Sequence, residues 1–137
     1  MTHNDQLQQK YQHFQLFQQQ IEQLTPQVEL LHQQQAELDL SLDALQELQK
    51  TVVPRELLAP LANGIFLRGE LKDNQKLIVN VGSEIAVEKT VPQVIELLQQ
   101  QLQDIAERVL EAEALLQQFT AQATKLYREL QKQVQEE

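Results

Sequence analysis

The segment ELLAPLANGIFLRGELKDNQKLIVNVGSEIAVEKT, residues 56–90, decides the fold because its composition differs from that of both flanks. It contains all three glycines of the 137-residue chain but only one of its 27 glutamines, Gln75. Of the other glutamines, 15 precede this segment and 11 follow it. The composition therefore predicts a compact middle between two long glutamine-rich flanks.

Two runs within this segment have the composition of β-strands. Residues 64–71 and 76–82 are rich in β-branched and aromatic residues. The polar residues 72–75 between them predict a turn that joins the two runs as a hairpin.

Two further runs extend the predicted sheet on either side. Residues 56–61 can pair with the first run through a turn at 62–64, and residues 84–89 can pair with the second across 82–83. We therefore expect four short strands in two hairpins, over about residues 55–90.

Sheets this small cannot stand alone in water. A two-stranded hairpin is marginally stable, and its unpaired edges invite other strands. We therefore expect an oligomer in which the hairpins of several subunits close into a β-barrel platform. The apolar hairpin residues expected at this interface are Leu58, Leu61, Ile65, Phe66, Leu67, Leu77, Ile78, Val79, Val81, Ile85 and Val87.

The flanks carry the seven-residue repeat of a coiled coil. With Leu7 at heptad position a, an apolar stripe runs along residues 7–45, and a second stripe runs along residues 95–130. Stripes of about six heptads favour a coiled coil over ordinary globular helices. They predict helices over about residues 5–50 and about residues 92–135.

The short middle segment favours an antiparallel pairing of these two helices. This pairing brings Leu24 toward Phe119 and Phe14 toward Leu130, and it predicts an elongated molecule. The predicted fold class is α+β, mostly α. A single domain over residues 1–137 is expected, with two β-hairpins between the helices of a long antiparallel coiled coil.

Pro26 interrupts the helical pattern of the first flank. A proline inside a helix loses one backbone hydrogen bond and costs about 3 kcal/mol. A kink in one continuous helix is the favoured interpretation. A break into two helices, with Thr25 capping the second, is the alternative.

Composition argues against several classes of function. The net charge of −9 disfavours nucleic-acid binding, and the absence of cysteine excludes thiol chemistry and Cys-ligated metals. His13 and His32 lack metal-ligand spacing, and a two-helix hairpin supplies no cleft for paired carboxylates. We expect no enzyme activity, no metal or cofactor, and no membrane association. The amino terminus lacks the features of a signal peptide, so a cytoplasmic location is expected.

The order of elements and several short motifs resemble the alpha-type subunits of prefoldin. The motifs are Pro60-Leu61, the glycine at Gly64, the turn at 71–73, Val81-Gly82 and the run 86–90. The resemblance implies an ATP-independent chaperone subunit, a holdase, in a hexamer of two alpha-type and four beta-type subunits. It also implies that non-native proteins are bound at the coiled-coil tips and delivered to a group II chaperonin.

The residues near the helix tips fit this implied role. Five of the six aromatic residues lie in the helix portions farthest from the hairpins, and Tyr11, Leu16 and Tyr127 fall outside the heptad stripe. The candidate client-binding residues are Leu7, Tyr11, Phe14, Leu16, Phe17, Leu126, Tyr127, Leu130 and Val134. For those on the stripe, ordinary coiled-coil packing is the competing interpretation. A structural or adaptor coiled coil that holds one folded partner is the alternative function.

Overall fold

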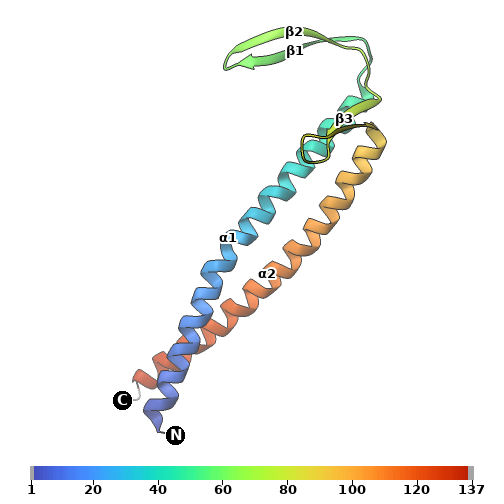
Figure 1. Cartoon of the computed structure of the whole chain (residues 1–137). Coiled ribbons are helices and arrows are strands. Elements are labelled where there is room, and N and C mark those ends of the chain that lie inside the picture. Colours follow the sequence, from blue (N-terminus) through green and yellow to red (C-terminus); the bar gives the residue numbers. More distant parts are fainter. Residues whose placement is uncertain (1, 136–137) are drawn as a thin grey trace. The chain divides into compact units, whose positions relative to one another are not determined.

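The computed structural model describes residues 2–135 and contains two helices with four strands between them (Figure 1). This arrangement confirms the predicted fold class. The elements are α1 His3–Lys50, β1 Arg55–Ala62, β2 Ile65–Leu71, β3 Lys76–Asn80, β4 Ala86–Thr90 and α2 Val91–Gln135. The chain divides into two compact units. Within the described residues, the terminal unit comprises 2–35 and 104–135, and the hairpin unit comprises 36–103.

In the terminal unit, α1 and α2 run antiparallel and pack along the predicted heptad stripe (Figure 1). Val28, Val109 and Ala123, all at stripe positions, are buried. The rings of Phe17 and Phe119 lie 5.9 Å apart between centroids. The other stripe positions of this unit are half-buried rather than exposed. The seven-residue period therefore identified the face on which the two helices pack.

Helix α1 continues through Pro26 without a break. The hydroxyl of Thr25 donates a hydrogen bond of 2.7 Å to the Ile21 carbonyl, one turn back in the same helix. Thr25 therefore bonds within the helix, as threonine does in helix interiors, and does not cap a second one. Pro26 itself is exposed, so its ring stays outside the packed face.

The hairpin unit contains two separate two-stranded antiparallel sheets. Strand β1 pairs with β2, with Arg55 opposite Leu71, and β3 pairs with β4, with Lys76 opposite Thr90. Strands β2 and β3 do not pair, so the predicted hairpin that joins residues 64–71 to 76–82 is wrong. The two outer pairings were predicted correctly.

The connector between β2 and β3 is bonded to the helix ends instead. The Asn74 side-chain amide donates to the carbonyl of Thr51 at 2.8 Å and to that of Leu48 at 3.2 Å. The Val91 backbone N–H, at the start of α2, donates to the Gln75 carbonyl at 2.8 Å. These bonds satisfy backbone groups at helix ends, and this is the physical reason the connector does not form a tight hairpin turn.

The turn between β3 and β4 is longer than predicted. The backbone N–H of Val81 donates a hydrogen bond of 2.9 Å to the Ile85 carbonyl, and Ser83 and Glu84 both have positive φ angles. Strand β4 therefore begins at Ala86 rather than at residue 84. Side chains alternate between the two faces of β3, where Leu77 is half-buried and Ile78 is 81% exposed.

Candidate functional site

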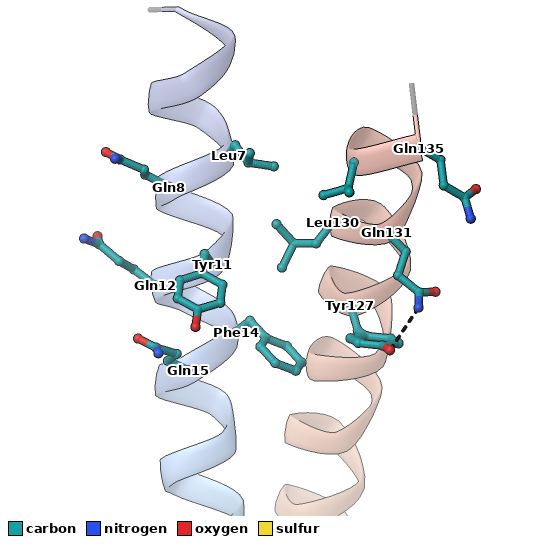
Figure 2. Close-up of a pocket in the computed structure, with 11 residues that line it drawn as sticks. Leu7, Gln8, Tyr11, Gln12, Phe14, Gln15, Tyr127, Leu130, Gln131 and Gln135 are labelled. Carbon is teal, nitrogen blue, oxygen red and sulfur yellow. Dashed lines mark hydrogen bonds between the residues drawn. The ribbon is translucent and has the colours of Figure 1, made fainter. Parts of the chain in front are cut away.

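An open apolar groove lies between the two helices in the terminal unit (Figure 2). It has a volume of about 930 Å³, and we call it the tip groove. Its lining residues are Leu7, Gln8, Tyr11, Gln12, Phe14 and Gln15 of α1 with Tyr127, Leu130, Gln131, Val134 and Gln135 of α2. The helical repeat of 3.6 residues places residues 7, 11 and 14 on one face of α1, which forms one wall of the groove.

Aromatic side chains form the floor of the tip groove. The rings of Phe14 and Tyr127 lie 5.9 Å apart between centroids at an interplanar angle of 32°. Figure 2 shows Leu7 and Phe14 directed toward α2, with Leu130 directed toward α1. Tyr11 and Tyr127 remain about half exposed. The groove therefore presents apolar surface that the chain's own packing leaves accessible.

Six of the nine predicted client-binding residues line this groove: Leu7, Tyr11, Phe14, Tyr127, Leu130 and Val134. The other three do not. Phe17 packs against Phe119, Leu126 is half-buried on the heptad stripe, and Leu16 is half exposed away from the groove lining. The structure thus brings together the predicted residues nearest the helix ends. Whether any of the nine contacts a client stays a prediction.

Five glutamines on the groove borders were not identified from the sequence. Figure 2 shows Gln8 and Gln12 along the outer side of α1, and Gln131 and Gln135 along the outer side of α2. The Gln131 amide donates a hydrogen bond of 2.9 Å to the Tyr127 hydroxyl. The available signal was the spacing of these glutamines, which follow the helical repeat beside the apolar positions.

Among residues 2–135, the side chains that line the groove are all uncharged. The nearby Lys10 and Glu129 form an ion pair with each other, with an N–O distance of 3.4 Å. A second cross-helix contact joins His32 Nε2 to Glu113 Oε1 at 2.6 Å, and both of these side chains are exposed. The surface at the groove is therefore apolar with a neutral polar border.

The hairpins carry a second apolar surface. Among the predicted interface residues, Ile78 is 81% exposed, Leu58 and Leu61 are each 64% exposed, and Phe66 is 56% exposed. Ile65, Leu67, Val81 and Ile85 are also exposed, whereas Leu77, Val79 and Val87 are half-buried. Adjacent residues on β2 point to opposite faces of a strand, so Ile65, Phe66 and Leu67 leave both faces of that hairpin apolar. That these residues form the interface between subunits stays a prediction.

Residues 2–135 contain no cluster of three acidic or histidine side chains arranged to hold a metal ion. Within the same range, neither helix contains an apolar stretch that suffices to cross a bilayer.

Three comparisons relate the chain to known proteins. A family model described as Prefoldin subunit matches residues 17–136. The chain is 24% identical over 132 residues to prefoldin subunit alpha of Methanococcus aeolicus, in an alignment that covers 96% of this chain and 90% of that protein. It is 27% identical over 137 residues to prefoldin subunit alpha of Archaeoglobus fulgidus, in an alignment that covers 100% of both chains.

A solved structure has the same fold. The cryo-EM structure of a filamentous PFD from Methanocaldococcus jannaschii aligns with a TM-score of 0.69 and 20% sequence identity. The alignment covers 86% of this chain and 98% of that chain.

Proposed function

The chain belongs to the prefoldin family, and from this premise we propose that it is an alpha-type subunit of an ATP-independent chaperone. In this proposal, two copies assemble with four beta-type subunits in the cytoplasm. The hexamer holds non-native proteins at its coiled-coil tips and delivers them to a group II chaperonin. No nucleotide, metal or other cofactor takes part.

The tip groove is the observation that carries the client-binding part of this proposal. It presents the half-exposed rings of Tyr11 and Tyr127 beside Leu130 in an open site of about 930 Å³. Non-native proteins expose apolar side chains, and burying one such side chain contributes roughly 1.5–3 kcal/mol. Several grooves acting on one client raise the effective affinity without any stronger individual contact.

The hairpin surface supports the proposed assembly. Its exposed side chains lie on two-stranded sheets that cannot bury both faces within one chain. Pairing with strands of other subunits would cover these faces and satisfy the free edges. Native mass spectrometry of the chain, alone and with a beta-type subunit, tests this part, and a complex of two alpha-type and four beta-type chains is expected.

The client-binding part is tested by suppression of aggregation. The assembled complex should prevent aggregation of several unrelated denatured proteins without ATP, as measured by light scattering. Replacing Tyr11 and Tyr127 with Ser should abolish most of this suppression while the mass of the complex is unchanged. Protection of a single folded partner only, with no effect on denatured proteins, would instead identify an adaptor coiled coil.

A matched variant defines the extent of the site. Leu16 is as exposed as Tyr11 but does not line the groove. If binding is confined to the groove, Leu16→Ser should retain the suppression that the Tyr11→Ser variant loses. Equal losses in both variants would show that the binding surface extends beyond the groove to Leu16.

A further inference from the structure

We propose that Asn63 is a site of spontaneous covalent modification. Its side-chain amide cyclises onto the backbone nitrogen of Gly64, and the ring then hydrolyses to aspartate or isoaspartate. Water is the only co-reactant, and no enzyme takes part. The inference goes beyond the proposed chaperone function because it concerns a chemical change in the hairpin unit of the chain itself.

Asn63 and Gly64 form the turn that ends the β1–β2 hairpin (Figure 1). Ala62 pairs with Ile65 across this turn, so the two residues between them lie outside the strand ladder, and both are exposed. Gly64 has a φ angle of 78°. Apart from its two neighbours in the chain, no heavy atom of residues 2–135 lies within 4 Å of the position that a Cβ would occupy on this glycine. The Asn63–Gly64 peptide is therefore open to water, and its nitrogen is not shielded by a side chain.

This pair of residues supplies both reacting groups. The Gly64 backbone nitrogen loses its proton and attacks Cγ of Asn63, which closes a cyclic imide. The Cγ–Nδ2 bond breaks, and the leaving nitrogen takes up a proton and departs as ammonia. Water then adds to one of the two imide carbonyls and breaks its bond to the Gly64 nitrogen. Opening at Cγ gives aspartate, and opening at the backbone carbonyl gives isoaspartate. The attack is intramolecular, so it needs no binding step.

The other two asparagines of the hairpin unit are held in place by hydrogen bonds. The Asn74 side-chain amide donates to two backbone carbonyls near the end of α1, at 2.8 and 3.2 Å. The Asn80 side-chain oxygen accepts a hydrogen bond of 3.0 Å from the backbone N–H of Gly82. Asn80 is also followed by Val81, whose β-branched side chain crowds the backbone nitrogen that would have to attack. Both features favour Asn63 as the reactive asparagine of this unit.

The modification changes the hairpin in two ways. Either product adds a negative charge two residues from both Leu61 and Ile65, which are 64% and 55% exposed. Isoaspartate also lengthens the main chain of the turn by a methylene carbon, which disturbs the pairing of Ala62 with Ile65. A charge beside an apolar surface opposes burial of that surface. Where the hairpins assemble as proposed above, modified chains are therefore expected to enter the complex less readily than unmodified ones.

Peptide mapping of the full chain, incubated alone in mildly alkaline buffer, tests the modification itself. Trypsin separates the three asparagines, because residues 56–68, 73–76 and 77–89 form different peptides. Peptide 56–68 should gain the mass difference between an amide and a carboxylic acid at least about tenfold faster than peptide 77–89, because glycine leaves the attacking nitrogen unhindered. An isoaspartyl methyltransferase with S-adenosylmethionine should label the same peptide. Conversion of Asn63 no faster than that of Asn80 would overturn the inference.

Two variants link the reaction to this residue. Asn63→Gln keeps an amide in the turn but moves its carbonyl carbon one bond further from the Gly64 nitrogen, so ring closure should slow at least about tenfold. Asn80→Gln is the matched control and should leave the conversion of Asn63 unchanged. Methyltransferase labelling should disappear in Asn63→Gln and persist in Asn80→Gln. Labelling that persists in Asn63→Gln would overturn the assignment to Asn63.

The effect on assembly is measured by competition between modified and unmodified chains. A partly modified sample is mixed with a limiting amount of beta-type subunit, and the modified fraction is compared between the complex and the free chain by mass spectrometry. This fraction should be at least about twofold lower in the complex. Equal fractions would overturn the expected effect on assembly. Failure of the unmodified chain to form any complex would instead refute the proposed assembly, and the peptide map would still decide whether Asn63 is the modified residue.

Discussion

The terminal unit and the hairpin unit both present apolar side chains to solvent, but the surroundings of these side chains differ. In the tip groove, the opposite helix half-covers the rings of Phe14 and Tyr127, and neutral glutamines border them. In the hairpins, Ile78 and Leu58 project from two-stranded sheets and are 81% and 64% exposed. A groove completed within one chain can release its ligand without loss of fold. An apolar two-stranded sheet needs a lasting cover from other strands.

The largest expected effect follows from charging the hairpin surface. Phe66→Asp combined with Ile78→Asp should dissociate the proposed complex with the beta-type subunit, because burying each native side chain contributes roughly 1.5–3 kcal/mol and buried aspartates would lack partners. Sedimentation velocity should show the loss of mass, and circular dichroism should show the helices retained. Leu40→Asp is the control, since Leu40 is 70% exposed on α1 of the same unit. An unchanged mass of the double variant would refute the hairpin interface.

The terminal unit is expected to respond next most strongly, through its helix interior. Pro26→Ala restores an N–H that can donate to the Glu22 carbonyl, one turn earlier in α1. The free energy of unfolding should rise by up to about 3 kcal/mol, as measured by urea denaturation. Gln27→Ala, at the exposed position next to Pro26, should change the free energy of unfolding by no more than about 0.5 kcal/mol. A rise in the free energy of unfolding with unchanged assembly would show that the stability of α1 and the assembly of the hairpins are independent. A fall would mean that proline at position 26 stabilises α1.

A smaller effect is expected where the hairpin unit joins its helices. Asn74→Ala removes both hydrogen bonds to the carbonyls of Leu48 and Thr51, which should lower the free energy of unfolding by about 1–3 kcal/mol. Asn63→Ala, in the turn between β1 and β2, is the matched control. It should change the free energy of unfolding by no more than about 0.5 kcal/mol. Equal effects of the two variants in urea denaturation would show that Asn74 does not hold the connector.

The smallest effect is expected from the contact of His32 with Glu113 in the terminal unit. Both side chains are exposed, so a double-mutant cycle with His32→Ala and Glu113→Ala should give a coupling energy of about 0.2–1 kcal/mol. The thermal midpoints of the four proteins measure this coupling. A larger value would mean that charge pairing, rather than the apolar stripe, stabilises the helix pair.

The candidate site, the tip groove, was predictable in part from the heptad stripe that also predicted the helices. Tyr11 and Tyr127 lie one position outside the packed stripe, and the structure leaves both about half exposed, as that position requires. The grouping of six residues around one groove was not predictable, because it depends on the register between helices that are distant in sequence. The role of the glutamines as its borders depends on the same register.

The sequence by itself determined the long helices and the strand positions, because these follow from local periodicity. A repeat of seven places stripe residues on one helical face, and β-branched runs bounded by polar turns form strands. Continuity of α1 through Pro26 and the separation of β2 from β3 were decided only by the tertiary structure. Strands β2 and β3 are separate because Asn74 and Gln75, between them, form hydrogen bonds with Thr51 and Val91 at the helix ends. Local composition had predicted a hairpin turn at these residues.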